Sequence, residues 1–214
     1  TSTTKGAAFE RSQTIGLKPI KTLNNLDSAQ KILKEILLAT GEGYEDIERI
    51  AVSGGGGRSI GDTLLELPVM KVDEIKAIGL GGLALSRKQK ALVVSMGTGT
   101  ALVVASDGGR KIQHIGGSGV GGGTIEGLSR WMLGTDKFEI IEEMAKRGNA
   151  SSVDLTVEDI AGGPVGMVPG DATASNFGKI TPGSYKEDIA AAIFNMVSQV
   201  VGVIAAMAAK AYSL

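Results

Sequence analysis

The sequence has no cysteine and only one histidine, and these two shortages exclude several kinds of chemistry. Without cysteine there can be no disulfide, no thiolate nucleophile and no cysteine-ligated metal, and a single histidine cannot build a multi-histidine metal site. Any metal ion would therefore have to be Mg²⁺, which prefers oxygen ligands and the phosphates of a substrate.

Neither sign of charge is in excess, because 22 lysines and arginines face 23 aspartates and glutamates for a net charge of −1. Such a balance gives no electrostatic footprint for nucleic acid or for an anionic membrane surface, so we expect neither as a partner. The first residues show no charged segment followed by an apolar run, which predicts no signal peptide and a cytoplasmic location.

Proline is scarce, with five residues, whereas glycine is abundant, with 32. The glycines show no Gly-X-Y period, so neither a collagen helix nor a disordered linker fits. They gather in discrete loops instead, which indicates ligand binding through the backbone. A length of 214 residues allows one large domain or two smaller lobes.

The central stretch 91–129 contains two of these glycine loops. Apolar, β-branched runs at 91–94 and 101–105 predict two strands around Gly97–Thr100, and Gly121–Thr124 opens a predicted helix. Free backbone N–H groups in such loops, and at a helix start, can bind anions. The stretch is therefore interpreted as a phosphate cradle, while Asp107–Gly109 is expected to be a plain hairpin turn.

Hydrophobic periodicity predicts further elements on both sides of this stretch. We expect helices over 27–39, from 73 onward, and over 138–147, with strands over 47–52 and 68–72. The first helix should be capped by Asp27 or Ser28 and stopped by Gly41. Trp131 and Met132 are expected in the core.

Three further segments are candidates for function, and the first two allow two interpretations each. Residues 1–6 could be a disordered terminus, or half of a β-hairpin that grips phosphate with Lys5 as the point charge. Glu74 could complement the dipole of the helix it begins, or act as a general base. Residues 162–178 form a long loop of the kind that is often functional.

The final segment, 185–214, contains 21 uncharged residues between Asp188 and Lys210. This length could span a bilayer. Polar residues at mid-span, such as Asn195, and the alanine-rich composition favour instead a fully buried helix at a domain or subunit interface.

Three motifs together suggest a family: Ser95–Thr100, His114–Thr124 and Pro169–Gly178 resemble, in order and spacing, the type II pantothenate kinases. The resemblance implies an α/β fold of the actin-like (ribonuclease H-like), two-lobed ATPase type, with lobes at 1–90 and 91–214. It also implies that the family's leading N-terminal strand and its C-terminal segment are missing from this chain. The expected activity is the ATP- and Mg²⁺-dependent phosphorylation of pantothenate to 4′-phosphopantothenate by a homodimer, the first step of coenzyme A synthesis.

Carried over position by position, the resemblance implies that Glu74 is the catalytic base that takes the proton from the pantothenate hydroxyl. It places His114 and Thr98 near the substrate. The implied nucleotide contacts are Thr3, Thr4, Lys5, Gly97, Thr98, Gly99, Thr100, Gly122, Gly123, Thr124, Ile125, Glu126 and Phe138, the last at the adenine.

The chain also departs from the family pattern. His114 stands where the family frequently has an arginine, and a neutral imidazole stabilises phosphoryl charge less well than a guanidinium does. Two other functions therefore stay open. The chain could be an ATP-driven activator or sensor of the same superfamily, without a pantothenate acceptor, or a catalytically silent dimeric scaffold.

Overall fold

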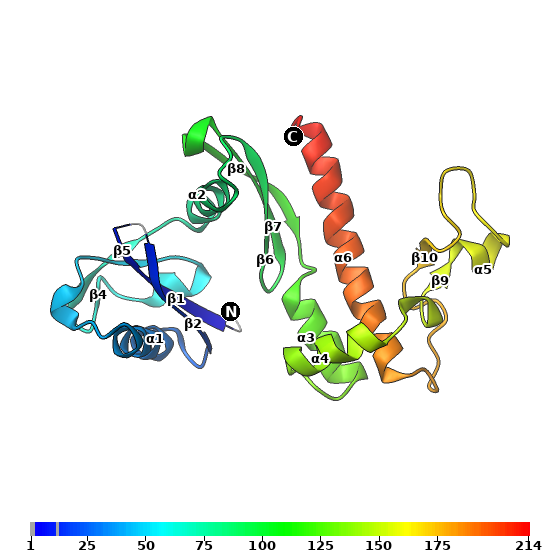
Figure 1. The fold of residues 1–214 in the computed structure, drawn as a ribbon, viewed down its shortest axis with the longest axis horizontal. Coiled ribbons are helices and arrows are strands. Elements are labelled where there is room, and N and C mark those ends of the chain that lie inside the picture. The colour runs from blue at the N-terminus through cyan, green and yellow to red at the C-terminus, as the bar shows by residue number, and fades with distance from the viewer. Residues whose placement is uncertain (1–2, 12) are drawn as a thin grey trace. The chain divides into compact units, whose positions relative to one another are not determined.

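A computed structural model describes residues 3–11 and 13–214 (Figure 1). The chain divides into two compact units. Unit 1 comprises Thr1–Val93 and Val103–His114, and unit 2 comprises Val94–Leu102 and Ile115–Leu214. The lobe boundary expected between residues 90 and 91 stays a prediction.

Unit 1 begins with an antiparallel hairpin packed against one helix: β1 Thr3–Glu10, β2 Gln13–Lys21 and α1 Asn25–Thr40. The hairpin lies close to the helix because Gly6 has no side chain. A Cβ there would come within 2.8 Å of Ile36 Cδ1. The hairpin expected from residues 1–6 is thus confirmed from Thr3 onward, and Thr1 and Ser2 lie outside the described residues.

The expected cap of α1 was wrong. Asn24 caps the helix, and its side-chain oxygen accepts a hydrogen bond from the Asp27 amide at 2.8 Å. Ser28 instead accepts from the Leu23 amide, one turn earlier, at 3.2 Å. Asparagine caps as well as aspartate or serine does, so the helix begins earlier than the apolar period indicates. Gly41 ends it as expected, with a φ of 78°.

A second small sheet in unit 1 also packs against α1, and its strand order is β3-β5-β4. Its strands are β3 Ile50–Val52, β4 Thr63–Leu64 and β5 Leu67–Lys71. β3 runs parallel to β5, and β4 runs antiparallel to it. The strand expected over 47–52 is therefore shorter than predicted, and a 3₁₀ turn, Tyr44–Asp46, lies before it.

Helix α2, Glu74–Ser86, starts after Asp73, whose carboxylate caps it by accepting from the Lys76 amide at 2.9 Å. Two of its glycines pack closely on strand residues of the same unit. A Cβ at Gly79 would come within 2.7 Å of Ile112 Cγ2, and one at Gly82 would come closer still to Val93 Cγ2. Glycine on this helix face is therefore explained by close packing.

The sheet β6-β7-β8 follows α2 in the chain. Its strands are β6 Ala91–Met96, β7 Thr100–Ser106 and β8 Lys111–Ser118. Both strands expected around the first glycine loop are confirmed. The hairpin turn expected at Asp107–Gly109 is confirmed, because a 3₁₀ turn over these residues joins β7 to its neighbour β8. The bounds of β8 were not predicted, because Gln113, His114 and two glycines interrupt its apolar pattern.

The core of unit 2 is helical and is built by α3 Gly122–Met132, α4 Phe138–Arg147 and α6 Lys186–Ala211. Its most deeply buried members include Ile141 and Ile193, each fully inaccessible to solvent. Met132 packs against this core as expected. Trp131 does not, because its side chain is 89% exposed.

Between α4 and α6 the chain forms short elements: a 3₁₀ turn Ala150–Ser152, β9 Leu155–Thr156, α5 Val157–Ala161 and β10 Thr173–Ser175. The expected long loop 162–178 is thus partly ordered into a strand that pairs with β9. Val165 and Val168 also form a bridge within it.

Helix α6 confirms the long C-terminal helix (Figure 1), and its expected burial at a domain or subunit interface stays a prediction. Ala190, Ile193 and Val197 in the first half are at most 1% exposed, whereas Val203 and Met207 in the second half are 52% and 68% exposed. By length and composition alone, α6 could also cross a membrane, a test that the core helix of a soluble protein passes as well.

Acid should weaken the interactions of Asp159 at the start of α5 and so lower the stability of the fold. Asp159 accepts hydrogen bonds from Lys179 Nζ at 2.6 Å and from the amide and hydroxyl of Thr156 at 2.8 Å. The lysine contributes most, and together these donors lower the pKa of Asp159 from 3.8 to about 2. Because the pKa is lower in the folded protein, the ionised carboxylate stabilises the fold above about pH 4, and this contribution disappears as the pH falls towards 2.

We therefore expect the difference in Tm between the wild type and Asp159→Asn to be largest above about pH 4 and to shrink between pH 4 and pH 2. Thermal unfolding at closely spaced pH values would measure it. A difference that stayed constant across this range would show that the Lys179 ion pair does not form in solution.

Candidate functional site

The first glycine loop, between β6 and β7, is a tight turn in which the Gly97 amide donates to the Gly99 carbonyl at 2.8 Å. Thr98 stands exposed at its tip. Within the described residues, the amides of Thr98 and Gly99 donate to no protein acceptor, and the Thr98 hydroxyl has no protein partner. This turn therefore offers three free donors to a ligand, and such donors suit an anion.

The second glycine loop packs directly on the first. The Gly122 amide donates to the Gly97 carbonyl at 2.8 Å, and the Gly123 amide donates to the Thr98 carbonyl at 2.9 Å. A side chain completes the contact, because the Thr100 hydroxyl donates to the Val120 carbonyl at 2.8 Å. We call residues 97–100 and 119–123 together the loop clasp.

Glycine is required in the loop clasp because two backbones touch there. A Cβ at Gly121 would lie 2.8 Å from the Gly99 carbonyl carbon, and one at Gly122 would lie 2.9 Å from the Gly97 oxygen. Neither glycine has a positive φ. Close approach, and not backbone conformation, therefore explains this part of the glycine pattern.

The expectation that the start of α3 supplies free amides was wrong. The Gly121 amide donates to the Thr124 hydroxyl at 3.1 Å, and the amides of Thr124 and Ile125 donate to the Gly121 carbonyl. With Gly122 and Gly123 held in the loop clasp, the first turn of α3 has no free N–H. Ile125 also places its side chain in the core, at 5% exposure, so it offers a ligand no free donor.

The hairpin residues expected to bind phosphate lie on β1 in unit 1. Lys5 and Thr3 are exposed, and within the described residues Lys5 has no ion-pair partner. The Thr4 hydroxyl is hydrogen-bonded to the Thr22 hydroxyl at 2.8 Å, so it is already used inside the hairpin. Lys5 is therefore the hairpin side chain best able to reach a ligand.

Glu74 and His114 also lie in unit 1. Glu74 is the first residue of α2 and is exposed, and the described residues include no ion-pair partner for its carboxylate. His114 is exposed on β8. The loop clasp belongs to unit 2, so the assignment of Glu74 and His114 to the same site stays a prediction.

Phe138 and Glu126 lie in unit 2, like the loop clasp. Phe138 is the first residue of α4 and is 43% exposed. It meets Phe194 of α6 edge to face, with ring centroids 5.8 Å apart. The rest of its ring is available for a contact such as stacking on a base. Glu126 is half-buried on α3.

Sequence reasoning missed a buried carboxylate. Asp154 is 1% exposed and accepts hydrogen bonds from the Phe177 amide and from Asn195 Nδ2, each at 2.7 Å. Asn195 Nδ2 also donates to the Thr173 hydroxyl at 3.0 Å. This network fixes the loop motif 173–178 on α6. The polar Asn195 inside the uncharged stretch of α6 was the available signal.

No group of three acidic or histidine side chains in the described part of the chain could hold a metal ion. The protein donors therefore do not form a metal cage on their own. A Mg²⁺ ion that entered with a nucleotide would be bound chiefly through the phosphate oxygens. We assign no residue to it.

Two solved structures resemble this chain along almost its whole length. The activator of the 2-hydroxyisocaproyl-CoA dehydratase from Clostridium difficile, with bound ADPNP, matches 95% of this chain and 71% of its own, with a TM-score of 0.66 at 12% identity. The (R)-2-hydroxyglutaryl-CoA dehydratase component A from Acidaminococcus fermentans matches 97% and 75%, with a TM-score of 0.67 at 13% identity. The expected actin-like ATPase fold is confirmed.

Curated relatives agree with the motifs. A type II pantothenate kinase from Bacillus anthracis is 34% identical over 165 residues, which are 72% of this chain and 59% of the relative. Pantothenate kinase 1 from Oryza sativa subsp. japonica is 40% identical over 121 residues, 53% of this chain and 18% of the relative. The chain thus spans about three fifths of the length of the bacterial relatives it matches. The Fumble family model matches residues 88–214, and the chain belongs to this family.

Proposed function

We propose that this chain carries the ATP-binding and phosphoryl-transfer centre of a pantothenate kinase, which makes 4′-phosphopantothenate in the first step of coenzyme A synthesis. The observation that carries the proposal is the loop clasp, in which the second glycine loop holds a turn that has three free hydrogen-bond donors. A solved structure with a similar fold has ADPNP bound. The similarity to type II pantothenate kinases supports pantothenate as the acceptor.

In this proposal Thr98 and Gly99 hold the phosphates of ATP, through the Thr98 amide and hydroxyl and the Gly99 amide. The second loop acts indirectly: Gly122 and Gly123 fix the turn by binding its carbonyls, so that its donors are oriented before the ligand arrives. Preorganised donors stabilise developing charge because they need no rearrangement during the reaction. Phe138 contacts the adenine.

Glu74 accepts the proton of the pantothenate primary hydroxyl as the oxygen attacks the γ-phosphorus of ATP and ADP leaves. Lys5 neutralises phosphate charge from the hairpin, and His114 contacts the substrate. Phosphoryl transfer asks the protein mostly for positioning and charge neutralisation, which these residue types supply. A Mg²⁺ ion bound with the nucleotide would neutralise part of the phosphate charge.

The proposed enzyme is a cytoplasmic homodimer whose two lobes, residues 1–90 and 91–214, close on ATP. The exposed apolar residues on the second half of α6, among them Val203 and Met207, support an association of two subunits, because apolar surface of this kind is removed from water in an interface.

The first test mixes the protein with ATP and Mg²⁺, with and without pantothenate, and measures ADP release. We expect release to depend on pantothenate and 4′-phosphopantothenate to form in equal amount. ADP release at the same rate without pantothenate would support an ATP-driven activator or sensor instead. If ATP left Tm unchanged, nucleotide binding itself would be ruled out.

A further inference from the structure

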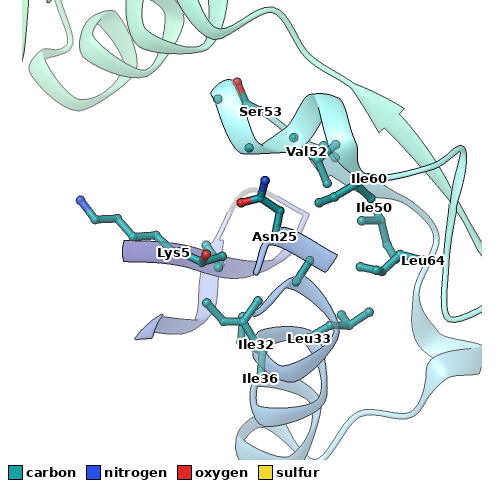
Figure 2. A pocket seen from close by; sticks show the side chains of 18 of the residues that line it. Lys5, Asn25, Ile32, Leu33, Ile36, Ile50, Val52, Ser53, Ile60 and Leu64 are labelled. Carbon is teal, nitrogen blue, oxygen red and sulfur yellow. The ribbon is translucent and has the colours of Figure 1, made fainter. Parts of the chain in front are cut away.

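The nucleoside end of ATP has only one contact in the proposed function. Phe138 offers the adenine part of a ring, because Phe194 packs against it edge to face. A cavity of about 410 Å³ in unit 1 does not supply a second platform (Figure 2). Its lining includes aliphatic side chains such as Ile32 and Ile36 of α1, and none of its lining residues is aromatic. Bases stack on aromatic rings, so an exposed aromatic side chain suits this role better.

Trp131 is an aromatic side chain that the fold leaves in water. It is the only tryptophan in the sequence, and it is 89% exposed on α3 although a core position was expected. Tryptophan is highly buried on average in folded proteins, because its ring carries a large apolar surface. The indole of Trp131 is instead available to a ligand over most of its surface.

The end of α3 that carries this exposed ring is itself held in place. The Arg130 guanidinium bonds to the Asp136 carboxylate at 3.0 Å and closes the turn between α3 and α4. Lys186 Nζ donates to the Leu133 carbonyl at 2.9 Å and so ties the end of α3 to α6. A binding ring needs such support, because a ligand that must first order its platform binds less tightly.

Helix α3 connects this ring with the free donors of the loop clasp. The Thr98 side chain lies against the first turn of the helix, because a Cβ at Gly123 would come within 2.8 Å of Thr98 Cγ2. Thr124, the next residue, and Trp131 are spaced i and i+7 and so lie on one face of α3. The rise between them is about 10 Å, at 1.5 Å per residue. This rise is comparable to the span of an extended nucleotide from its β-phosphate to its base.

We infer that Trp131 stacks on the base of ATP while Thr98 and Gly99 hold the phosphates, so that the nucleotide lies along α3. This role rests on the proposed function and adds a second aromatic contact to that of Phe138. Phe138 begins α4 directly after the turn that follows α3. A stacked ring binds any base through its π-face, so Trp131 supplies affinity for the nucleoside, whereas the loop clasp fixes the phosphates.

The fluorescence of Trp131 provides the first test, because no other tryptophan contributes to the emission of the chain. The 214-residue chain is titrated with ATP and Mg²⁺, and separately with inorganic tripolyphosphate and Mg²⁺, which offers the phosphates without the base. We expect ATP to quench the emission and tripolyphosphate to leave it unchanged. Equal quenching by both compounds would overturn the stacking role. So would an emission that changed with protein concentration and not with ATP, because Trp131 would then lie between two copies of the chain.

Substitutions provide the second test, with Kd measured by isothermal titration calorimetry. Trp131→Ala should raise the Kd for ATP by about 5- to 150-fold, the range that base stacking contributes, and leave the Kd for tripolyphosphate unchanged. Trp131→Phe should restore most of the affinity for ATP. Tyr185→Ala is the matched control, since Tyr185 is an aromatic residue of unit 2 with 76% exposure, and it should bind ATP like the wild type.

Two failures can be told apart. An unchanged Kd for ATP in Trp131→Ala, with the ATP-induced rise in Tm intact, would overturn the role of Trp131 and leave the proposed function standing. If neither ATP nor tripolyphosphate bound to the wild type, the proposed function would fail, and the role of Trp131 with it.

Discussion

Replacing Glu74 with glutamine is expected to lower pantothenate-dependent turnover by a factor of about 10²–10⁴, the range that a general base contributes. Glutamine keeps the size of the side chain but cannot accept the proton of the pantothenate hydroxyl. The stability of α2 should change little, because Glu74 is exposed and a charge at a helix start contributes only about 0.3–1 kcal/mol. Steady-state kinetics with a coupled ADP assay would measure the loss.

Asp73→Asn is the matched control for this variant. It removes a carboxylate from the adjacent position, and asparagine keeps the cap on the Lys76 amide. We expect turnover close to wild type for Asp73→Asn, and the same ATP-induced rise in Tm for both variants. Near-normal kcat in Glu74→Gln would remove Glu74 from the mechanism. A loss of the ATP-induced rise would give it a binding role instead.

Gly121→Ala should disrupt the loop clasp. The added Cβ would meet the Gly99 backbone at 2.8 Å, and a backbone cannot rotate away as a side chain can. Overpacking of this kind costs about 1–3 kcal/mol, which for a chain of this size lowers Tm by roughly 2–12 °C. Because the two loops must separate, the free donors of Thr98 and Gly99 lose their fixed orientation. The ATP-induced rise in Tm should therefore fall as well.

Gly127→Ala provides the control on the same helix. Apart from the adjacent residues and the backbone of its own helix, no heavy atom of the described residues lies within 4 Å of a Cβ at this position. Alanine is favoured over glycine inside a helix by about 0.5–1 kcal/mol. This variant should keep the ATP response and unfold at an equal or higher temperature. If Gly121→Ala matched it in both measurements, the two loops would not be in contact in solution.

Local patterns predicted much of this fold. The apolar period predicted the bounds of α4 as the structure has them, Phe138–Arg147. Gly41 ends α1 as predicted, because glycine readily adopts the left-handed conformation found there. These successes share a cause, since helix periodicity and glycine caps act over a few neighbouring residues. The bounds of β8 were not predicted, because a strand with polar residues and glycines depends on its neighbours in the sheet for stability.

The glycine loops were found from the sequence, but their internal contacts were not. A run such as Gly121–Thr124 looks the same whether its amides face a ligand or another loop, because sequence does not record where a hydrogen bond goes. The structure resolves this by pairing Gly122 and Gly123 with the carbonyls of the first loop. The cluster around Asp154 was missed for a related reason, since its partner Asn195 lies 41 residues away.

The Asp154 cluster has a consequence for how unit 2 unfolds. The carboxylate of Asp154 holds both the loop motif 173–178 and α6, through hydrogen bonds from Phe177 and Asn195. If either the loop or the helix detached alone, the buried carboxylate would lose a hydrogen-bond donor, at a cost of about 1–3 kcal/mol. Loop and helix therefore detach together, in one cooperative opening.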